Sequence, residues 1–405
     1  MEIDVRCRIC SGRLEQVADF GRQPLSDAFR VPAEQREEFF FRLAVGVCGS
    51  CSMVQLMEEV PRARMFHDGY PYLSSGSSVM REHFAAFAER VMSGWSDPFV
   101  VELGCNDGVM LGNLARAGVR HLGVEPSGGV ADRAAAQGVR VCKEFFESGV
   151  AERIRAADGP ADVIYAANTL CHIPYVGSIL QGVATLLGPQ GVFVFEDPYL
   201  GDVVRLTSFD QIYDEHFFLF SAGSVQRMAA PYGLELVDVE RLAVHGGEVR
   251  YTLARKGARE QSAAVRDLLA DEDAQGIADA DALRAFAGRA ADTRDRLVAL
   301  LTELRERGAS VAGYGATAKS ATVLNYCGIG PDLIPFIVDT TPAKQGRLTP
   351  GSHIPIRGPE AFRDPYPDYA VLFAWNHAEE IMAKEQEFRE AGGQWIRYVP
   401  EVHVA

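Results

Sequence analysis

The chain contains 405 residues, of which 47% are hydrophobic and 23% are charged, and its formal net charge is −15 at neutral pH. This composition is typical of a soluble globular protein, and the length exceeds what one ordinary hydrophobic core organises, so we expect roughly two or three domains. The acidic balance excludes nucleic acid as an expected partner, because no excess of basic residues is available to neutralise phosphates.

The sequence gives no signal for a membrane or for secretion. No apolar run approaches the length of a membrane span, and residues 1–4 begin neither a basic nor an apolar leader segment. We therefore expect a cytoplasmic protein that has no membrane partner and is present as a monomer or a weak oligomer.

Two CxxC knuckles near the N-terminus form the first motif. Cys7 and Cys10 make one knuckle, and Cys48 and Cys51 make the other. Four thiolates complete a closed, structural Zn²⁺ site, whereas a chance or redox pairing is the weaker alternative. The spacing exceeds that of the usual zinc ribbon, so residues 20–42 should form a loop or small subdomain that depends on the metal for much of its folding free energy. The remaining cysteines are interpreted as small buried hydrophobic residues: Cys105, Cys142, Cys171 and Cys327.

A glycine turn between two short strands is the most informative feature of the chain. A strand at 99–103 leads into the turn at 104–108 and a helix that begins near residue 109, and a strand at 121–124 ends on Glu125. A Rossmann-like sheet holds S-adenosylmethionine in this way, because the glycines let the backbone approach the ligand and the second carboxylate accepts the ribose hydroxyls. This order therefore predicts a methyl-donor site.

Further strands are expected at 139–142, 161–166 and 191–196, and they alternate regularly with helices. This alternation predicts a parallel, doubly wound sheet with its ligands at the carboxyl ends of the strands, and strands at 234–240 and 248–254 should extend it antiparallel. Asn and Asp also favour such turns for purely structural reasons, but several matching strand ends favour a cofactor site. The candidate cofactor-binding residues are Glu102, Gly104, Asn106, Asp107, Gly108, Glu125, Phe145, Phe146 and Asn168.

The densest group of acid–base side chains lies at 210–218. Tyr213, Glu215 and His216 stand close together there and are followed by aromatic residues that can exclude water. Histidine suits proton abstraction near neutral pH, a carboxylate can orient its ring, and a tyrosine can donate to a developing oxyanion. A histidine beside aromatic residues is as readily a core residue with a satisfied hydrogen bond, so the residues alone leave both interpretations open.

The C-terminal third contains a second glycine motif. Residues 257–307 have helical periodicity and should form two long amphipathic helices, and a second αβ unit follows at 309–405. The turn at 313–318 fits G-x-G-x-x-A and precedes Lys319, and the next strand ends on Asp339. This fingerprint suits a nucleotide-like anion, although a glycine turn used only for packing is the alternative.

These features predict an α/β protein in three parts. Residues 1–76 form a small zinc-binding module, and residues 77–255 form a Rossmann-like methyltransferase domain that binds S-adenosylmethionine. Residues 256–405 form a helical linker and a second Rossmann-like α/β domain.

In this order the three parts resemble the sugar C-methyltransferases that act on nucleotide-linked deoxysugars in antibiotic biosynthesis. More narrowly, the chain is similar to the C-3′-methyltransferases of dTDP-3-amino-4-keto-2,3,6-trideoxyhexoses, of the tetronitrose-pathway type. The resemblance spans nearly the whole chain. Its specific stretches are GRQPLSD (21–27), YPYLSSGSSVMREHF (70–84), VELGCNDGVML (101–111), YAANTLCHIPYV (165–176), FEDPYLGD (195–202), SFDQIYDEHFFLFS (208–221), VHGGEVRYTLAR (244–255), GYGATAKSATVLNY (313–326) and FAWNHAEEI (373–381).

The resemblance implies that the C-terminal domain binds the dTDP portion of a dTDP-linked 4-keto deoxysugar rather than NAD. Tyr314, Lys319 and Asn376 are the candidates for this contact. The residues implied for the sugar site are one of Tyr70 and Tyr72, together with His172, Tyr213, Glu215 and His216.

A carbon next to a ketone is acidic enough for an enzymic base, provided that the enolate oxygen is stabilised. We therefore expect His216 to take the C-3′ proton, with Glu215 orienting its ring. Tyr213 or His172 would support the C-4′ oxyanion, and in-line attack on the donor methyl would follow.

Three alternatives stay open. The first is C-methylation of a neutral dTDP-4-keto deoxysugar at C-3 or C-5. The second is an NAD(P)-dependent oxidoreductase that uses the C-terminal fingerprint. The third is a zinc-scaffolded binding protein whose methyltransferase sheet is inactive.

Overall fold

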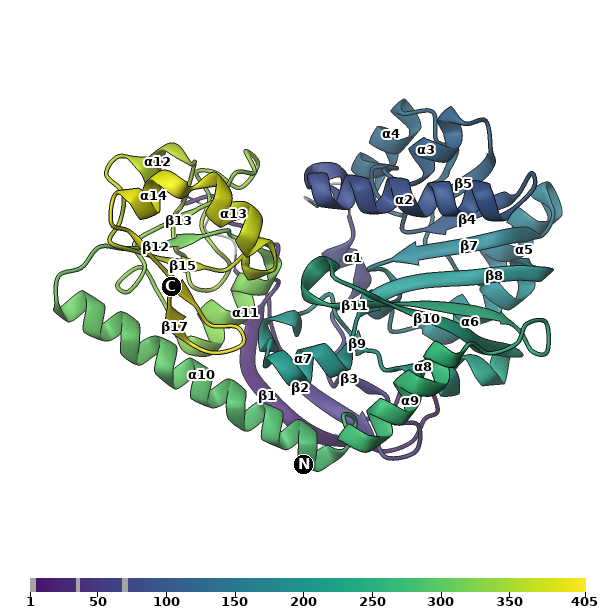
Figure 1. Cartoon of the computed structure of the whole chain (residues 1–405), viewed down its shortest axis with the longest axis horizontal. Helices are drawn as coiled ribbons and strands as arrows, with labels where there is room; N and C mark the ends of the chain where they lie inside the picture. The colour runs from purple at the N-terminus through teal and green to yellow at the C-terminus, as the bar shows by residue number, and fades with distance from the viewer. Residues whose placement is uncertain (1–4, 34–36, 68–71) are drawn as a thin grey trace.

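The computed structural model describes residues 5–33, 37–67 and 72–405. Within these residues the chain forms three β-sheets, with the largest on the right of Figure 1 and the C-terminal sheet on the left. Strands from the N-terminal residues run below and between these two sheets, and the long helix α10 (Ala280–Glu306) follows the lower edge. The predicted α/β architecture, with an N-terminal module and two Rossmann-like units, is confirmed.

The first sheet is antiparallel and has the strand order β1-β2-β3-β9. β1 (Leu14–Pro24) pairs with β2 (Phe40–Cys48), and β3 (Val54–Leu56) joins this pair to β9 (Phe218–Leu219), which comes from far along the chain. The expectation of a loop or small subdomain at 20–42 is wrong at both ends of that segment, since both ends belong to long paired strands. Phenylalanine and valine recur in β2, and such residues favour a half-buried pleated strand.

The second sheet has the order β10-β11-β8-β7-β4-β5-β6. The strands from β8 to β6 are parallel, and β11 and β10 extend the sheet antiparallel, as predicted. Helices cover both faces, which explains why β4 is buried along its whole length. The bounds are β4 (Phe99–Leu103), β5 (Arg120–Val124), β6 (Val141–Cys142), β7 (Ala161–Ala167), β8 (Leu187–Pro198), β10 (Leu234–Leu242) and β11 (Glu248–Arg255).

The helices that surround the second sheet are mostly short. The longest of them is α2 (Ser78–Gly94). The Ser221 side chain caps α8 by accepting from the backbone N–H of Ser224. The Ser224 side chain in turn accepts from the backbone N–H of Ser221. The other bounds are α1 (Arg62–Met65), α3 (Leu111–Arg116), α4 (Gly128–Ala136), α5 (Ser148–Asp158), α6 (Val176–Leu186), α7 (Leu200–Leu206) and α8 (Ala222–Ala229).

Two helices connect the second sheet to the third, as the periodicity predicted. They are α9 (Ala263–Gln275) and α10, which packs along β1 and against α11 (Ala318–Cys327). In the part of the chain that is described, no helix is both long and apolar enough to cross a membrane. The buried stripe of α10 recurs every three or four positions and comprises Leu283, Phe286, Ala290, Thr293, Leu297, Leu301 and Leu304.

The third sheet has the order β14-β13-β12-β15-β16-β17, parallel except for the last pair. The glycine turn after β12 leads into α11 (Ala318–Cys327), where the Thr317 side chain caps the helix by accepting from Ser320 N. The other bounds are β12 (Val311–Tyr314), β13 (Ile337–Val338), β14 (Ile356–Arg357), α12 (Glu360–Arg363), β15 (Tyr369–Leu372), α13 (Ala378–Lys384), α14 (Gln386–Glu390), β16 (Gln394–Arg397) and β17 (His403–Val404).

The cysteines outside the two knuckles do not all behave alike. Cys105, Cys171 and Cys327 are buried, as expected, but Cys142 is only half-buried. Cys142 lies on β6 at the edge of the second sheet, and its Sγ is 3.7 Å from a carboxylate oxygen of Glu144. The interpretation of Cys142 as a buried hydrophobic residue is therefore wrong.

Candidate active site

The four cysteines of the two knuckles meet at one point. Cys7 Sγ lies 3.5 Å from Cys51 Sγ, Cys10 Sγ lies 3.4 Å from Cys48 Sγ, and all four sulfur atoms lie within 4.8 Å of one another. Tetrahedral Zn²⁺ with Zn–S distances of about 2.3 Å separates its sulfur ligands by about 3.8 Å. The sulfur cluster therefore fits zinc. A Cβ atom at Gly12 would lie 3.0 Å from Cys48 Sγ, so glycine keeps this cradle open.

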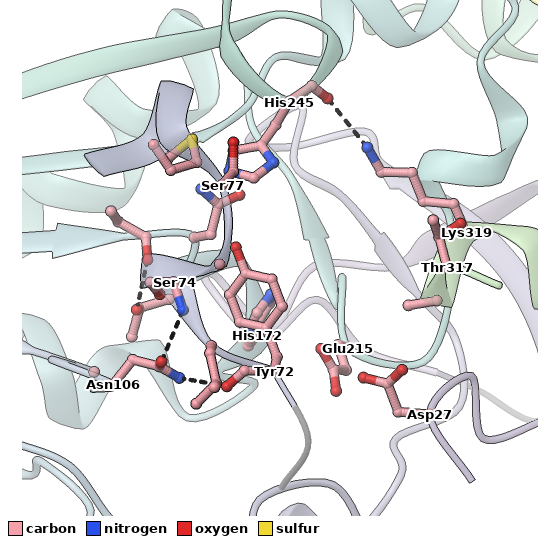
Figure 2. Close-up of a pocket in the computed structure, with 18 of the residues that line it drawn as sticks. Asp27, Tyr72, Ser74, Ser77, Asn106, His172, Glu215, His245, Thr317 and Lys319 are labelled. Atoms are coloured by element: carbon pink, nitrogen blue, oxygen red, sulfur yellow. Dashed lines mark hydrogen bonds between the residues drawn. The ribbon is translucent and has the colours of Figure 1, made fainter. Parts of the chain in front are cut away.

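A cavity of about 720 Å³ lies where the three parts of the chain meet (Figure 2). Its wall comes from the loop after β1, the carboxyl ends of strands of the second sheet, the segment before β9, and the glycine turn at the start of α11. Parallel strands end at the same edge of their sheet, and that edge of both Rossmann-like sheets borders the cavity. The two glycine turns thus share one cavity.

Both glycine turns require glycine at specific positions. Gly104 has φ +69°, and a Cβ there would lie 2.5 Å from Thr169 Oγ1. Gly315 has φ +90°, and a Cβ there would lie 2.9 Å from Ala374 Cβ. Each turn therefore combines a left-handed backbone with a close approach that a side chain would block.

A hydrogen-bond network around Asn106 and Glu125 borders the cavity on the side of the second sheet. Asn106 N donates to Glu125 Oε2 at 3.0 Å, and Ser127 N donates to Glu125 Oε1 at 2.8 Å. The Asn106 side chain accepts from Ser74 N at 3.0 Å and donates to Tyr72 O at 3.2 Å (Figure 2). Each carboxylate oxygen of Glu125 keeps a second lone pair, so the group can also accept from a ligand.

Glu102 and Asp107 lie behind the cavity wall. Glu102 is 3% exposed, and its Oε2 has no hydrogen-bond partner within the described residues. Burial raises the pKa of Glu102 well above its ordinary value, and the nearby carboxylates of Glu125 and Asp107 raise it further. Asp107 accepts from the Ser75 hydroxyl. Several buried carboxyl groups at one sheet edge suit a cationic ligand, and the sulfonium methyl donor is one.

Aromatic and amide side chains complete this side of the cavity. The guanidinium of Arg62 lies 4.3 Å from the ring centroid of Phe145, and Phe146 is 5% exposed beside it. Asn168 follows β7 with φ +47°, and its backbone N donates to Glu196 O at 2.7 Å. Phe145, Phe146 and Asn168 all border the cavity.

Tyr213 and His216 form a buried hydrogen-bonded pair. Tyr213 Oη lies 2.7 Å from His216 Nε2, and His216 Nδ1 lies 2.7 Å from the carbonyl oxygen of Gln211. A carbonyl oxygen only accepts, so Nδ1 carries the proton and Nε2 presents its lone pair to the tyrosine hydroxyl. Burial lowers the pKa of His216 well below its ordinary value, which keeps the ring neutral. Because both ring nitrogens are occupied, the expectation that Glu215 orients this ring is wrong.

His172 stacks on His216. Their ring centroids are 5.4 Å apart at 22°, and His172 also stacks on Phe66 at 5.7 Å. Its Nε2 is buried and lacks a hydrogen-bond partner in the described chain. Burial lowers the pKa of His172 to about 3, so this ring is neutral as well.

Both neighbouring parts of the molecule hold the segment 209–217. Asp214 Oδ1 accepts from Ser26 N at 3.0 Å in the N-terminal module. The carbonyl oxygen of Ile212 accepts from Thr322 Oγ1 at 2.8 Å on α11. The strand that follows, β9, pairs with β3 of the first sheet. The position of the Tyr213–His216 pair therefore depends on all three parts.

Asp210 adds two further contacts to the third sheet. Its Oδ2 accepts from Trp375 Nε1 at 2.6 Å and from the Tyr398 hydroxyl at 2.8 Å. Lys319 lies near this carboxylate and donates to the carbonyl oxygen of His245 at 3.2 Å. Burial lowers the pKa of Lys319, while the charge of Asp210 acts in the opposite direction.

Asp339 plays the part at the second glycine turn that Glu125 plays at the first. Its Oδ2 accepts from Ala316 N at 2.9 Å, and its Oδ1 accepts from Thr341 N at 2.7 Å. Lys344 donates to the carbonyl oxygen of Ala316 at 2.8 Å. The turn at 313–318, which fits the dinucleotide-binding pattern, is thus held by an acidic residue in the same way as the first glycine turn.

The hydroxyl of Tyr314 is bonded inside the third unit. It donates to Glu385 at 2.9 Å, and the ring packs edge-on against Phe362 and Trp395 in the core of the third unit. Tyr314 borders the cavity while its hydroxyl is used internally, so a contact between Tyr314 and a nucleotide stays a prediction.

Most predicted site residues reach the cavity. Glu102, Asp107 and Gly108 do not form its wall, and Gly108 instead packs against Ala134. Tyr70 lies outside the described residues. The predicted residues in the wall are Tyr72, Gly104, Asn106, Glu125, Phe145, Phe146, Asn168, His172, Tyr213, Glu215, His216, Tyr314, Lys319 and Asn376.

Several wall residues were not predicted from the sequence, among them Asp27, Gln211 and His245. Asp27 ends the GRQPLSD stretch, Gln211 lies within the acid–base segment, and His245 lies within VHGGEVR. Each belongs to a stretch that supported the family resemblance, which was the available signal. Residue type alone did not separate them from structural residues.

Three family models match successive parts of the chain. Residues 7–66 match "Putative zinc binding domain", residues 79–239 match "Methyltransferase domain", and residues 243–400 match "C-methyltransferase C-terminal domain". C-methyltransferase NovU from Streptomyces niveus is 36% identical over 404 residues, which cover 98% of this chain and 96% of the relative. The chain belongs to the C-methyltransferase family.

This C-methyltransferase depends on S-adenosylmethionine, and its cofactors are S-adenosylmethionine and zinc. Among solved structures, a SAM-dependent methyltransferase from Anabaena variabilis is 17% identical, covers 47% of this chain and 89% of its own, and has a TM-score of 0.37. Magnesium protoporphyrin IX methyltransferase from Synechocystis is 12% identical, covers 44% and 79%, and has a TM-score of 0.34.

Proposed function

We propose that this C-methyltransferase methylates C-3′ of a dTDP-linked 4-keto-2,3,6-trideoxyhexose in cytoplasmic deoxysugar biosynthesis. The observation that carries the proposal is the neutral Tyr213–His216 pair in the wall of a cavity that two glycine turns share. Methylation of carbon requires a base beside the acceptor carbon, and this pair supplies a lone pair and an acidic hydroxyl at one place.

His216 is the proposed base. Its Nε2 takes the C-3′ proton, and the electron pair left behind is delocalised onto the C-4′ oxygen as an enolate. Gln211 keeps the ring in the required tautomer through Nδ1. The carboxyl group of Glu215, which is 5% exposed and adjacent in the chain, offsets the charge that forms on the ring.

Tyr213 is the proposed donor to the C-4′ oxygen. Burial raises the pKa of Tyr213 well above its ordinary value, so its hydroxyl stays protonated and able to donate. When the acceptor is bound, this hydroxyl turns from His216 to the enolate oxygen and frees Nε2 for the proton. The neutral ring of His172 is the second candidate for this contact.

The donor side is assigned to the first glycine turn. Asn106 and Gly104 would hold the donor against the end of β4, and Glu125 would accept from its ribose hydroxyls. S-adenosylmethionine supplies an activated methyl group when bound. Zinc has no part in the chemistry, because four thiolates leave it no open position.

The nucleotide of the acceptor is assigned to the second glycine turn. Lys319 and the N-terminal end of α11 would hold the diphosphate, and Asn376 borders the same side of the cavity. The Tyr213–His216 pair borders the same cavity as the two turns, so donor and acceptor would meet at the base.

The test is incubation of the enzyme with S-adenosylmethionine and a panel of dTDP-4-keto sugars. Mass spectrometry reads the gain of one methyl group, and NMR identifies the methylated carbon. Methyl transfer to C-3′ is expected. Transfer to C-5 would favour the alternative acceptor, and turnover with NAD(P) but none with S-adenosylmethionine would overturn the proposal.

A further inference from the structure

Cys171, His172 and His216 form a second group of metal-binding side chains, separate from the four cysteines of the N-terminal module. The sulfur atom of Cys171 and one ring nitrogen of each histidine lie within 4.8 Å of one another. Cys171 and His172 lie on a short 3₁₀ turn (Leu170–His172) after β7, whereas His216 comes from the segment before β9. The fold therefore brings together three donors that the sequence keeps apart.

The two histidines present lone pairs in the way that metal ligands do. His216 Nδ1 donates to the carbonyl oxygen of Gln211 at 2.7 Å, which leaves the lone pair at Nε2. A metal-binding histidine usually donates its other ring N–H to a carbonyl or carboxylate oxygen, and this bond fixes the ring. His172 Nε2 is buried and has no hydrogen-bond partner in the described chain. His216 Nε2 meets the Tyr213 hydroxyl, a contact that the proposed mechanism already breaks.

The separation of the two rings fits a shared ion. The ring centroids of His172 and His216 are 5.4 Å apart. Two imidazoles on one tetrahedral ion, with metal–nitrogen distances of about 2.0 Å, place their ring centres about 5 Å apart. The three donor atoms are thus near the spacing that a common ion requires.

The chemistry of the donors selects the ion. One thiolate and two imidazoles suit Zn²⁺, whereas Mg²⁺ and Ca²⁺ prefer oxygen ligands. His172, labelled in Figure 2, and His216 border the cavity, so an ion can reach them from there, and Cys171 lies behind them with 0% exposure. A coordinated thiol is deprotonated outright, so its proton passes to solvent as the metal–sulfur bond forms.

We propose that Cys171, His172 and His216 form a second, inhibitory binding site for Zn²⁺. The bound ion occupies the Nε2 lone pair with which His216 would take the C-3′ proton, so methyl transfer stops while the ion is bound. The inhibition rests on the proposed function, because it requires His216 to be the base. The binding of the ion does not depend on that function.

The kinetic test adds Zn²⁺ to the enzyme that already carries its structural zinc. Methyl transfer by the wild type should be inhibited in competition with the acceptor. Cys171→Ser removes the sulfur ligand, so the inhibition constant for Zn²⁺ should rise about 100-fold, while kcat/KM without added Zn²⁺ stays within about 3-fold of the wild type. Cys327→Ser replaces a buried thiol outside the cluster and should change neither quantity.

The absorption spectrum of added Co²⁺ locates the ion independently of activity. A thiolate-to-metal charge-transfer band should appear in the zinc-loaded wild type and in Cys327→Ser, but not in Cys171→Ser. If the band persists in Cys171→Ser, or if Zn²⁺ inhibits this variant as strongly as the wild type, the inferred site is wrong. If the band depends on Cys171 and methyl transfer continues at its full rate, the metal site stands and His216 fails as the base of the proposed function.

Discussion

The backbone carbonyl of Gln211 fixes the tautomer of His216, the proposed base. It accepts from His216 Nδ1, and this bond places the imidazole lone pair at Nε2, where Tyr213 meets it. No side-chain carboxylate is needed for this orientation. Any residue at position 211 can supply the carbonyl, so a substitution there tests the amide side chain separately from the support of the base.

Replacing His216 by Asn tests the base. The shorter amide keeps a polar group but has no basic nitrogen, so both C-3′ deuterium wash-in and methyl transfer should fall by about 100- to 10,000-fold. Binding of S-adenosylhomocysteine should not change, because the donor is assigned to the first glycine turn and Glu125, and not to His216. Unaltered exchange and turnover would eliminate His216 as the base.

Asp197 provides a test of stability against pH. It is fully buried at the end of β8, its Oδ2 accepts from Cys171 N at 3.2 Å, and burial raises its pKa to about 8. An unfolded Asp titrates near pH ~4, so the folded state binds the extra proton and the free energy of unfolding falls as the pH rises from about 4 to about 8.

Asp197→Asn keeps the accepting oxygen without the charge. The midpoint of thermal unfolding should therefore rise by several degrees at about pH 8.5 and by much less at about pH 5. Differential scanning fluorimetry at the two pH values checks this. A shift of the same size at both values would mean that the Asp197 charge is not the cause.

At the scale of elements, the two-residue strand β9 connects the zinc site to the proposed chemistry. β9 (Phe218–Leu219) begins two residues after His216 and pairs with β3, which follows the second cysteine knuckle. Leu56 N also donates to the carbonyl oxygen of Phe217 at 2.9 Å. Zinc takes no part in the proposed reaction. The zinc site nevertheless supports β3, and β3 pairs with β9, the strand that follows the proposed base.

Cys48→Ser tests whether the zinc site supports the base through β3 and β9. Loss of one thiolate should release zinc and loosen β3, so methyl transfer should fall by at least about 100-fold while affinity for S-adenosylhomocysteine stays within about 3-fold. Zinc content, turnover and calorimetric binding give the three readouts. Cys142→Ser lies outside the cluster and should change none of them. Full turnover in a zinc-free Cys48→Ser enzyme would contradict the link through β9.

Elements with a local signal were predictable, and those made by distant pairing were not. The strand before Gly104 and the two CxxC knuckles could be read from residue patterns, because a buried parallel strand is apolar throughout and thiolate pairs bind metal at short spacing. β9 has only two residues and no pattern of its own. Its existence depends on β3, more than 160 positions earlier in the chain, and no local rule predicts such a pairing.

At the scale of the whole molecule, α11 of the third unit contacts the segment 209–217, which carries the proposed base. Thr322→Val removes the hydroxyl that bonds to the carbonyl oxygen of Ile212 while keeping the side-chain volume. We expect kcat to fall about 5- to 10-fold, with donor affinity unchanged, because one hydrogen bond to the segment 209–217 is lost. Steady-state kinetics measure the effect.

Thr322→Ser is the matched variant, because it keeps the hydroxyl and loses only a methyl group. It should retain most of the wild-type kcat. If Val and Ser lower kcat equally, packing at α11 matters and the hydrogen bond does not.

The site as a whole was predictable as a set of residues and not as a set of contacts. Cofactor, acid–base and nucleotide candidates were identified from their stretches, and most of them reach one cavity. The roles of Tyr314 and Glu215 were not predictable, since Tyr314 Oη finds Glu385 and His216 finds Gln211 only after distant parts pack together.

The segment that carries Tyr213 and His216 is bound to the first sheet through Ser26 and β3, and to the third unit through Thr322, Trp375 and Tyr398. In evolutionary terms this limits recombination. A chimera that takes its first or third part from a relative inherits mismatched anchors for the base, even if each part folds. New acceptor specificity is therefore more accessible through substitutions at the cavity wall than through the exchange of whole modules.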